Sequence, residues 1–415
     1  MNKLEEIAYK NYSRVNDFPV VVQKFGGSSV ADVERIMNVA EKIRHRVNQG
    51  NRLVVVVSAM GKTTDNLIKL AKQVMDQPDA RELDQLMATG EQVSSALLSM
   101  ALQSLKVKSK SLNAFQAGIE TVGKFSEGRI KCFDKKRLLS LLKINEVLVI
   151  AGFQGIMNGY ELTTLGRGGS DTSAVALAAA LNAPCEIYSD VAGIYTTDPK
   201  LYPAAKKAKM ISYDDMLELA GSGAKVLHGR SVEVAKRFNI PIYCGSSFSD
   251  EEGSYVVNED LIIEKNTVTG LSVMNNQLRF VIKKLPTDYS LVRGIFQTAA
   301  VAGLNVDMIS IIQDDDGITI SFTVIDEKKK RAESAVKKAL KELADYELEC
   351  HSGYVKVSVV GVGMKSGVGV ASDFFNALKN IPFKLVTTSE IKISCLIENE
   401  FKAAAVAALV KKFKL

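Results

Sequence analysis

Cysteine and histidine are scarce in this 415-residue chain, and the few that occur are not arranged as metal ligands. The cysteines stand singly, no two of them form a CxxC pair, and no histidine lies at a metal-ligand spacing. They are Cys132, Cys185, Cys244, Cys350 and Cys395. An odd number of scattered thiols is typical of reduced cysteines in a cytosolic protein, so we expect a cytoplasmic location and no metal site.

Long apolar runs and basic tracts are also missing. The longest run of small apolar residues, 174–181, is far shorter than the roughly 20 residues that span a bilayer. Residues 1–19 are a polar extension with too few apolar positions for a secretory signal. The net charge of +6 comes from 53 basic and 47 acidic side chains, and no stretch concentrates basic residues with aromatic ones as a nucleic-acid-binding surface does. We therefore expect no membrane and no nucleic acid, and small anionic ligands instead.

What the chain does contain, over residues 20–250, is an alternation of short β-branched runs with longer helical patterns. Several runs are apolar at consecutive positions, as in strands that are buried on both faces. Strands are predicted at 20–25, 52–59, 147–152, 185–190 and 240–244, and helices at 32–47 and 83–104. This pattern predicts a layered α/β domain with a mainly parallel sheet, which leaves enough chain for further domains.

The remaining sequence has shorter elements in an order that repeats. The first set is a strand near 278–283, a helix at 289–302, strands at 305–312 and 317–325, and a helix at 327–345. The second set lies at 354–361, 370–379, 384–389, 391–397 and 400–413. We predict two further domains of about 70 residues, at 265–345 and 350–415, each built in a β-α-β-β-α order.

The segment KFGGSSV carries the first chemical signal. Lys24 and Phe25 end a predicted strand, Gly26 and Gly27 form the turn, and a helix follows. Such a joint offers backbone N–H groups and a helix N-terminus to a phosphate, and a lysine beside it can stabilise a phosphoryl group in transfer. A plain tight turn between strand and helix is the alternative.

Two more loops are expected at the same edge of the sheet, where ligands of α/β folds collect. The segment SAMGKTTDNL, at 58–67, brings Ser58 and Thr64 there. In LGRGGSDTSAVALAAAL, at 165–181, Arg167 stands between glycines, with room to hold a carboxylate through two hydrogen bonds. Ser170 or Asp171 is expected to cap the helix that follows.

The last two candidate segments are weaker signals when taken alone. YSDVAGIYTTDPK, at 188–200, has the glycine, aspartate and proline of any turn-rich loop. Lys225 precedes a predicted helix, where the helix dipole disfavours a cation, so an anionic ligand is expected there. His228 is either a general base or, as is more common for a single helical histidine, a structural residue.

Together, in this order and spacing, the segments resemble the aspartate kinase family of the amino acid kinase fold, from about Val20 to the C-terminus. KFGGSSV and LGRGGSDTSAVALAAAL are specific as a pair. TGEQVSSALL, YSDVAGIYTTDP and AKVLHGRSVE distinguish the chain from kinases of glutamate, acetylglutamate, carbamate or UMP. The tail resembles two βαββαβ ACT domains, with TSEIKISCLI in the second. The resemblance implies ATP-dependent phosphorylation of the β-carboxylate of L-aspartate, the first step of the diaminopimelate route to lysine, threonine and methionine.

The resemblance also assigns roles to residues. The catalytic positions are Lys24, Asp171 and Lys225, and Asp171 would orient the lysines. The ATP positions are Lys24, Phe25, Gly26, Gly27, Ser58, Ser189, Asp190, Tyr195, Lys200, Lys225 and Val226. The aspartate positions are Thr64, Glu91, Arg167, Gly168, Gly169 and Ser170. From the residues alone, Glu91 would be a helix-start carboxylate.

The resemblance implies ATP as cofactor, with Mg²⁺ carried by the nucleotide, and no general base. A carboxyl group with a pKa of about 3.9 is already ionised at neutral pH, so charge repulsion is the obstacle to phosphoryl transfer. Two alternatives stay open: a kinase for a related acidic amino acid, and a catalytically idle amino acid sensor. The intact Lys24, Arg167, Asp171 and Lys225 disfavour the sensor.

The implied partners are lysine or threonine as effectors, and either a second copy joined through the ACT domains or a small regulatory ACT subunit. The tail departs from the family at Thr287–Ser290, where a different loop precedes a helix, and at Ile381–Lys384. Pro382 has no N–H to offer a bound carboxylate. We expect effector binding to be weakened, altered or lost, while the domains still mediate dimerisation.

Overall fold

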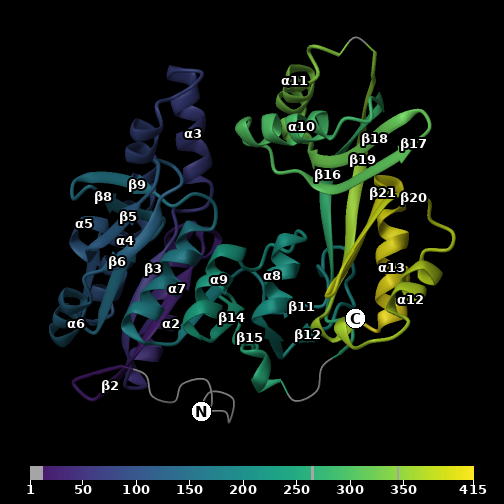
Figure 1. The fold of residues 1–415 in the computed structure, drawn as a ribbon. Helices are drawn as coiled ribbons and strands as arrows, with labels where there is room; N and C mark the ends of the chain where they lie inside the picture. The colour runs from purple at the N-terminus through teal and green to yellow at the C-terminus, as the bar shows by residue number, and fades with distance from the viewer. Residues whose placement is uncertain (1–12, 263–265, 344) are drawn as a thin grey trace. The chain divides into compact units, whose positions relative to one another are not determined.

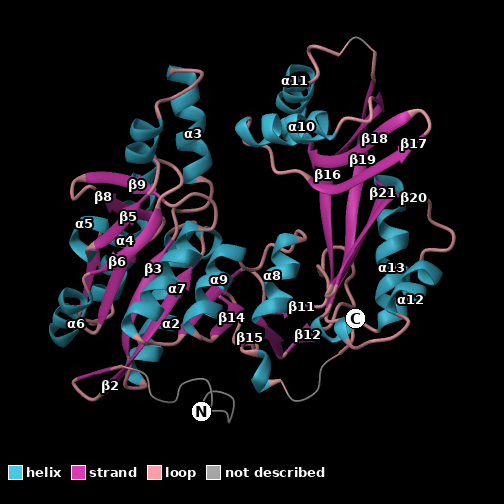
Figure 2. Ribbon diagram, viewed as in Figure 1, coloured by secondary structure: helices cyan, strands magenta, loops and turns pink. Residues whose placement is uncertain are grey.

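The computed structural model describes residues 13–262, 266–343 and 345–415, which form two compact units (Figures 1 and 2). The first unit contains the described residues up to Ile194, residues 207–220, and those from Lys225 up to the gap at 263–265. The second contains 195–206, 221–224 and the described residues that follow the gap. Of the expected polar extension, residues 1–12 lie outside the described residues, and β1 (Arg14–Val15) pairs with the first long strand.

The main sheet of the first unit has six parallel strands in the order β14-β10-β2-β3-β7-β4. They are β2 (Phe18–Phe25), β3 (Arg52–Val57), β4 (Ser109–Leu112), β7 (Val147–Ala151), β10 (Cys185–Ser189) and β14 (Ile242–Ser246). Beside β14 lie the antiparallel β15 (Ser254–Val257) and then β13 (Met210–Ser212). The predicted parallel α/β domain is confirmed, and its carboxyl strand ends meet at one edge.

Helices cover both faces of this sheet because its central strands are apolar at consecutive positions. On one face, α2 (Val33–Asn48) and α4 (Ala80–Ser104) pack in a shared core with the alternate residues Val21 and Phe25 of β2. On the other face, α7 (Gly169–Leu181) contacts β2 and β3, and α9 (Gly229–Phe238) packs on α7. Successive residues of β2 therefore face opposite helices.

The other elements of the first unit are short. A small sheet has the order β6-β5-β8-β9. Its strands are β5 (Ile119–Val122), β6 (Arg129–Phe133), β8 (Gln154–Met157) and β9 (Glu161–Thr164). The further helices are α3 (Thr63–Val74), α5 (Ala114–Ala117), α6 (Lys135–Ile144) and α8 (Tyr213–Gly221). Two short strands, β11 (Ile194–Tyr195) and β12 (Lys207–Ala208), lie where the chain passes between the residues of the two units.

The second unit is a single antiparallel sheet of six strands, in the order β17-β18-β16-β19-β21-β20. The strands are β16 (Gly270–Leu285), β17 (Asp307–Asp314), β18 (Gly317–Ile325), β19 (Glu347–Val360), β20 (Phe383–Ser389) and β21 (Lys392–Glu398). The helices are α10 (Tyr289–Val301), α11 (Lys329–Ala339), α12 (Val370–Ala377) and α13 (Lys402–Phe413). Two apolar cores lie side by side, one beneath α10 and α11 and one beneath α12 and α13.

The two central strands, β16 and β19, each serve both halves of this sheet. The later part of β16 pairs with β18 and with Glu347–His351 of β19, which completes a βαββαβ unit. The early part, Gly270–Met274, pairs instead with Lys356–Val360 of β19 and adds a fourth strand to the half of the sheet that contains β19, β21 and β20. The strand expected near 278–283 is therefore much longer than predicted, since its first residues belong to the neighbouring repeat.

Candidate functional site

Lys24 is the central charged group of the first unit. It is the penultimate residue of β2 and points to the α7 face, where its Nζ lies 2.6 Å from Oδ1 of Asp171. Only 9% of Lys24 is exposed. A nearly buried ammonium needs a compensating charge, and Asp171 in the first turn of α7 provides it. The ion pair ties β2 to the beginning of α7.

The turn after Lys24 is shaped by close backbone contacts. A side chain at Gly27 would place its Cβ 2.7 Å from the carbonyl oxygen of Ala59, and the N–H of Gly61 donates to the Gly27 carbonyl at 2.9 Å. Glycine is thus required because two loops touch there. Phe25 is fully buried and stacks on Tyr188, so its side chain is not available to a ligand.

The loop before α7 differs from the expectation in one respect. The helix begins at Gly169, its N-cap is Gly168 in the left-handed region (φ 68°), and no side chain caps it. The prediction that Ser170 or Asp171 caps the helix is therefore wrong, because Asp171 is directed to Lys24. Gly168 is also fixed by space, since a Cβ there would lie 2.1 Å from the ring of His228.

Glu91 lies in the middle of α4, so a role as a helix-start carboxylate is wrong. Its Oε1 accepts a hydrogen bond from the Ala59 N–H at 3.0 Å, and its buried Oε2 has no hydrogen-bond partner among the described residues. Burial raises the pKa of Glu91 to about 7. A buried carboxylate with one unsatisfied oxygen is suited to receive a cation from a ligand.

Arg167 is exposed and lines a cavity of about 960 Å³ with several other basic side chains. Among them, Arg230 donates to the carbonyl oxygens of Leu165 at 2.7 Å and Gly128 at 2.8 Å. Burial lowers the pKa of Arg230. Arg230 therefore holds the segment that leads into the glycine loop, while Arg167 presents an open guanidinium to ligands.

Ser58 and Thr64 flank the second loop of this edge. Ser58 directly follows β3, and its carbonyl oxygen accepts from the Ser94 hydroxyl of α4 at 2.8 Å. Thr64 is partly exposed in the first turn of α3. Helix α4 therefore supports this loop twice, through Glu91 and Ser94.

The predicted nucleotide residues fall into two groups. In the first unit, Ser189 ends β10 and Asp190 is exposed beyond it, and exposed Lys225 and partly buried Val226 precede α9. Tyr195 and Lys200 belong to segment 195–206, which is part of the second unit. There, Asp198 accepts from the Lys200 N–H at 2.9 Å. His228 is the N-cap of α9, which favours its structural interpretation.

Asp84 and Phe153 were missed by the sequence reasoning. Asp84 is fully buried in α4 and accepts four hydrogen bonds: from the N–H and hydroxyl groups of Ser126 and of Thr164. Phe153 has a φ of 68°, which is strained for an aromatic residue. No local motif marks either residue, since both depend on contacts between distant segments.

Two further features bear on ligands. Among the described residues, no group of three or more histidine, cysteine, aspartate or glutamate side chains is placed to hold a metal ion. None of the helices in the described ranges is both long and apolar enough to cross a membrane.

Comparison with known proteins agrees with this geometry. The amino acid kinase family model matches residues 19–246, and an ACT domain model matches residues 357–413. Aspartokinase 2 of Bacillus subtilis (strain 168) is 44% identical over 400 residues, covering 95% of this chain and 98% of that protein. The aspartokinase of Corynebacterium glutamicum is 42% identical over 406 residues, covering 95% and 96%.

Solved structures show the same relationship. Aspartokinase III of E. coli in complex with aspartate and ADP (R-state) superposes with a TM-score of 0.79 at 25% identity, covering 95% of this chain and 100% of that one. Its complex with lysine and aspartate (T-state) gives a TM-score of 0.75 at 25% identity, covering 95% and 99%. The chain therefore belongs to the amino acid kinase family and, within it, to the aspartokinases, the kinases that phosphorylate aspartate.

Proposed function

We propose that this chain transfers the γ-phosphoryl group of ATP to the β-carboxylate of L-aspartate, giving 4-phospho-L-aspartate and ADP, as the first step of lysine, threonine and methionine biosynthesis. The observation that carries the proposal is the Lys24–Asp171 ion pair beside the Gly26–Gly27 turn. A cation, backbone N–H groups and a helix N-terminus converge there at the carboxyl edge of a parallel sheet.

The chemistry needs positive charge more than it needs a base. The aspartate β-carboxylate is ionised at neutral pH and attacks directly, provided that its repulsion from the phosphates is reduced. Lys24 supplies charge at the transferred group, Asp171 holds that ammonium in position, and Lys225 contributes a second cation. Mg²⁺ carried by ATP would neutralise further phosphate charge.

On the aspartate side, Glu91 would receive the substrate ammonium and Arg167 a substrate carboxylate, with Thr64 and Gly168–Ser170 completing the site. The unsatisfied Oε2 of Glu91 supports this role, because a buried carboxylate gains most from a partner that brings positive charge. On the ATP side we assign Ser58, Ser189, Asp190 and Val226 with the two lysines, together with the backbone from Phe25 to Gly27. The roles of Tyr195 and Lys200 in ATP binding remain predictions from the family resemblance.

Replacing Lys24 tests the central assignment. We expect Lys24→Met to lower the rate of aspartate-dependent ADP release by about 10²–10³-fold or more, because the developing charge loses its nearest cation. The exposed Lys69→Met on α3 is the matched control and should keep full activity. Circular dichroism checks that both variants are folded. If Lys24→Met kept most of its activity, Lys24 would not have this role.

The choice of substrate is tested by trapping each acyl phosphate as its hydroxamate. Aspartate should give the product, while glutamate and other acidic amino acids should not. Product from another acid alone would favour the related-kinase alternative. A folded chain that binds amino acids but yields no hydroxamate from any of them would be the idle sensor instead.

The regulatory proposal concerns the second unit. A cavity of about 560 Å³ lies between the segment after β19 and the end of β20, with Lys365, Gly369 and Ser389 among its lining residues. In the first half, the Asp288 carboxylate is engaged by the N–H and hydroxyl groups of Ser290, which lower its pKa. We propose that the response to lysine or threonine is weakened, altered or lost, and that the unit pairs with a second copy or with a small regulatory ACT subunit.

Inhibition assays test this regulatory proposal. With lysine and threonine added at millimolar concentration, singly and together, we expect little change in aspartate kinase rate. Sharp inhibition by either amino acid would overturn the proposal.

For location we propose the cytoplasm, since the described cysteines, Cys132, Cys185, Cys244, Cys350 and Cys395, are all free thiols.

A further inference from the structure

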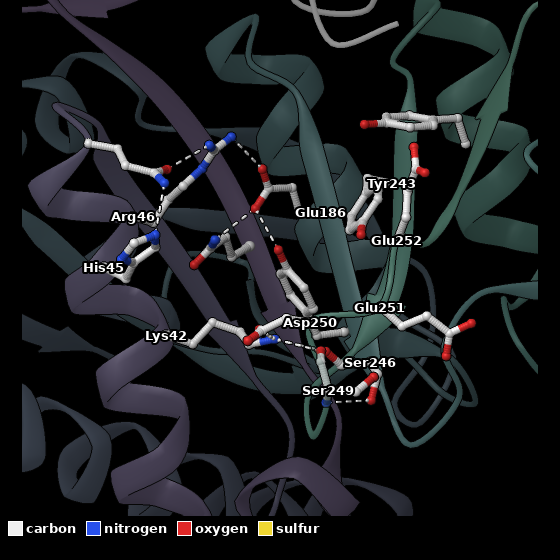
Figure 3. Close-up of a pocket in the computed structure, with 14 residues that line it drawn as sticks. Lys42, His45, Arg46, Glu186, Tyr243, Ser246, Ser249, Asp250, Glu251 and Glu252 are labelled. Atoms are coloured by element: carbon white, nitrogen blue, oxygen red, sulfur yellow. Dashed lines mark hydrogen bonds and ion pairs between the residues drawn. The ribbon is translucent and has the colours of Figure 1, made fainter. Parts of the chain in front are cut away.

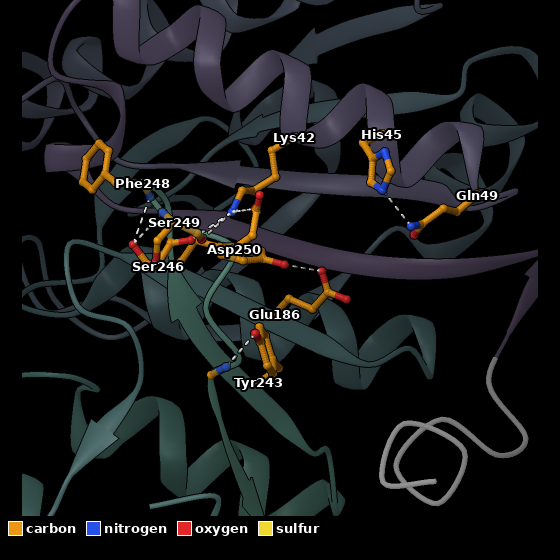
Figure 4. A network of polar contacts seen from close by, with 11 residues as sticks. Lys42, His45, Gln49, Glu186, Tyr243, Ser246, Phe248, Ser249 and Asp250 are labelled. Atoms are coloured by element: carbon orange, nitrogen blue, oxygen red, sulfur yellow. Dashed lines mark hydrogen bonds and ion pairs between the residues drawn. The ribbon is translucent and has the colours of Figure 1, made fainter. Parts of the chain in front are cut away.

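Two cavities of the first unit have basic side chains in their lining, and they differ in how those side chains are engaged. One, of about 400 Å³, lies between α2 and the segment that follows β14 (Figure 3). Its Lys42 donates to the carbonyl oxygens of Ser246 at 3.1 Å and Ser249 at 3.2 Å, and it lies 3.5 Å from Asp250 (Figure 4). That lysine is committed to its own surroundings, whereas most cations of the cavity around Arg167 are not.

The cavity of about 960 Å³ that Arg167 lines, here called the basic cavity, lies within the first unit between β6, α7 and α9. Helix α7 contributes small side chains from one face: Thr172, Ala176, Ala179 and Ala180. Phe133 of β6 and Val234 and Phe238 of α9 add apolar surface. Arg167 is the one residue of the assigned aspartate and ATP sets in this lining, so most of the cavity has no role in the proposed reaction.

Positive charge is in excess around the basic cavity. Its lining includes six permanent cations: Arg129, Lys131, Lys135, Arg167, Arg230 and Arg237. Lys131 lies 3.4 Å from Glu120, which is outside the lining. Even if the two lining carboxylates, Glu127 and Glu233, each neutralised one further cation, three cations would remain. In the described ranges, neither Lys135 nor Arg237 forms an ion pair with a carboxylate.

Like charges are also held close together in this lining. Burial lowers the pKa of Arg230, and the positive charge of the neighbouring Arg129 lowers it further. Arg230 is engaged by the backbone carbonyl groups of Leu165 and Gly128, which carry no full negative charge. The repulsion between the two guanidinium groups is therefore not removed within the chain, and an anion brought to the cavity would reduce it.

Strand β6 offers unpaired backbone to the same cavity. It is the edge strand of the small sheet, and among the described strands its neighbour is β5. Ile130 and Phe133 are paired with buried residues of β5 and face the interior, whereas Arg129 and Cys132 are on the opposite face. Residues of both faces line the cavity, so the cavity passes the free edge of the strand. An edge strand has backbone N–H and C=O groups without a strand partner.

These features together favour one kind of ligand. A small anion would use the cations but not the strand edge, and a second copy of the same basic surface would bring like charge against like charge. We propose that the basic cavity binds an extended acidic segment of a partner protein, which adds to the small sheet as a strand beside β6. Backbone hydrogen bonds to β6 would hold the segment, and its carboxylates would pair with the unpaired cations.

A synthetic peptide tests the charge requirement. The probe is a hexapeptide of alternating glutamate and valine with blocked ends, titrated by calorimetry into the full chain without nucleotide or aspartate. We expect saturable binding that weakens as salt is added, and no binding when lysine replaces glutamate. With glutamine in place of glutamate, binding should be about tenfold weaker or more. Equal binding of the glutamine peptide, binding of the lysine peptide, or no binding of the glutamate peptide would overturn the proposal.

A second peptide tests the addition of a strand. Methylation of every backbone nitrogen in the glutamate peptide removes its N–H donors and leaves its carboxylates unchanged. We expect this peptide to lose binding, because it cannot donate to the carbonyl groups of β6. If it bound as tightly as the unmethylated peptide, the cavity would be a site for anions that does not use the strand edge, and the proposal would be wrong.

Charge reversal at lining positions locates the binding. Lys135 and Lys136 are exposed neighbours in the first turn of α6, and Lys135 lines the cavity whereas Lys136 does not. Glutamate is favoured at the start of a helix, so both variants should fold, as circular dichroism can verify. We expect Lys135→Glu and Arg237→Glu to weaken binding of the glutamate peptide about tenfold or more, and Lys136→Glu to bind as the parent chain does. Unchanged binding in both lining variants would refute the site.

Discussion

Two carboxylates of α4 show how burial acts on single residues. Asp84 and Glu91 are both almost inaccessible, yet Asp84 accepts four hydrogen bonds and Glu91 Oε1 accepts one from Ala59. The four donors to Asp84 satisfy a charged group, as a structural carboxylate requires. Glu91 lacks such support, and its pKa rises to about 7. A residue that folding leaves unsatisfied is a strong candidate for binding.

The first prediction concerns stability and Glu91. Because the folded-state pKa lies above the ordinary value of 4.5, the folded chain retains a proton that the unfolded chain releases. The contribution of this bound proton to the free energy of unfolding is complete below pH 4.5 and is lost as pH rises through 7. We expect Glu91→Gln to be more stable than the parent by up to about 3 kcal/mol at pH 8, and to lose that advantage near pH 4. Thermal unfolding at both pH values measures it, and an advantage that did not depend on pH would contradict the raised pKa.

The same residue predicts a pH dependence of binding. Protonated Glu91 cannot pair with the substrate ammonium, so the KM for aspartate should rise about tenfold for each pH unit below 7 while kcat changes less. Glu91→Gln should show a high KM at every pH. Steady-state kinetics between pH 5.5 and 8.5 tests this, and identical profiles for parent and variant would remove Glu91 from the aspartate site.

The residue scale also shows what local sequence can reveal. Lys24 and Gly27 were found because a lysine and two glycines follow an apolar strand, and such a signal is contained within a few residues. The interior position of Glu91, the missing side-chain cap of α7 and the strained Phe153 depend on contacts between segments far apart in the chain. The pairing of Asp171 with Lys24 was expected only through the family resemblance.

At the scale of elements, α4 supports two loops of the proposed site. Glu91 binds the loop after β3 through Ala59, and Asp84 binds both Ser126 and Thr164, the residue that ends β9 ahead of the glycine loop. Hydrophobic periodicity predicted α4 as a helix, and it predicted the parallel strands β2, β3, β7, β10 and β14 within a few residues. It did not predict β4 or the strands of the small sheet, β5, β6, β8 and β9. Periodicity does not show which polar residues of a helix are buried, so the supporting role was not foreseen.

Asp84→Asn tests this role. An amide in place of the carboxylate would set its own N–H group against the donors of Ser126 or Thr164, so we expect a loss of about 1–3 kcal/mol of stability. The loosened loop should raise the KM for aspartate more than it lowers kcat, because Arg167 and Gly168 follow Thr164. Glu82→Gln, exposed on the same helix, should change neither. Lower stability with an unchanged KM would limit Asp84 to a purely structural role.

At the scale of the whole molecule, the two halves of the second unit share the strands β16 and β19. Sequence repetition predicted two similar sets of elements. It could not show that Gly270–Met274, which precede the first set, form the edge partner of Lys356–Val360 in the second. Each core is closed by a strand that continues into the other, so β16 and β19 couple the two halves mechanically. We expect the halves to unfold together.

Phe374→Ala tests this coupling. Phe374 of α12 is completely buried in the core beneath α12 and α13, so its truncation should cost about 3–5 kcal/mol. If β16 and β19 transmit this loss of stability to the other half, backbone amide hydrogens will exchange faster in β18 as well as in β21. Strand β18 belongs to the other core. The adjacent Phe375 is 38% exposed, and Phe375→Ala should perturb both strands far less. Faster exchange confined to β21 would mean that the halves open separately, and the shared strands would then join two independent units.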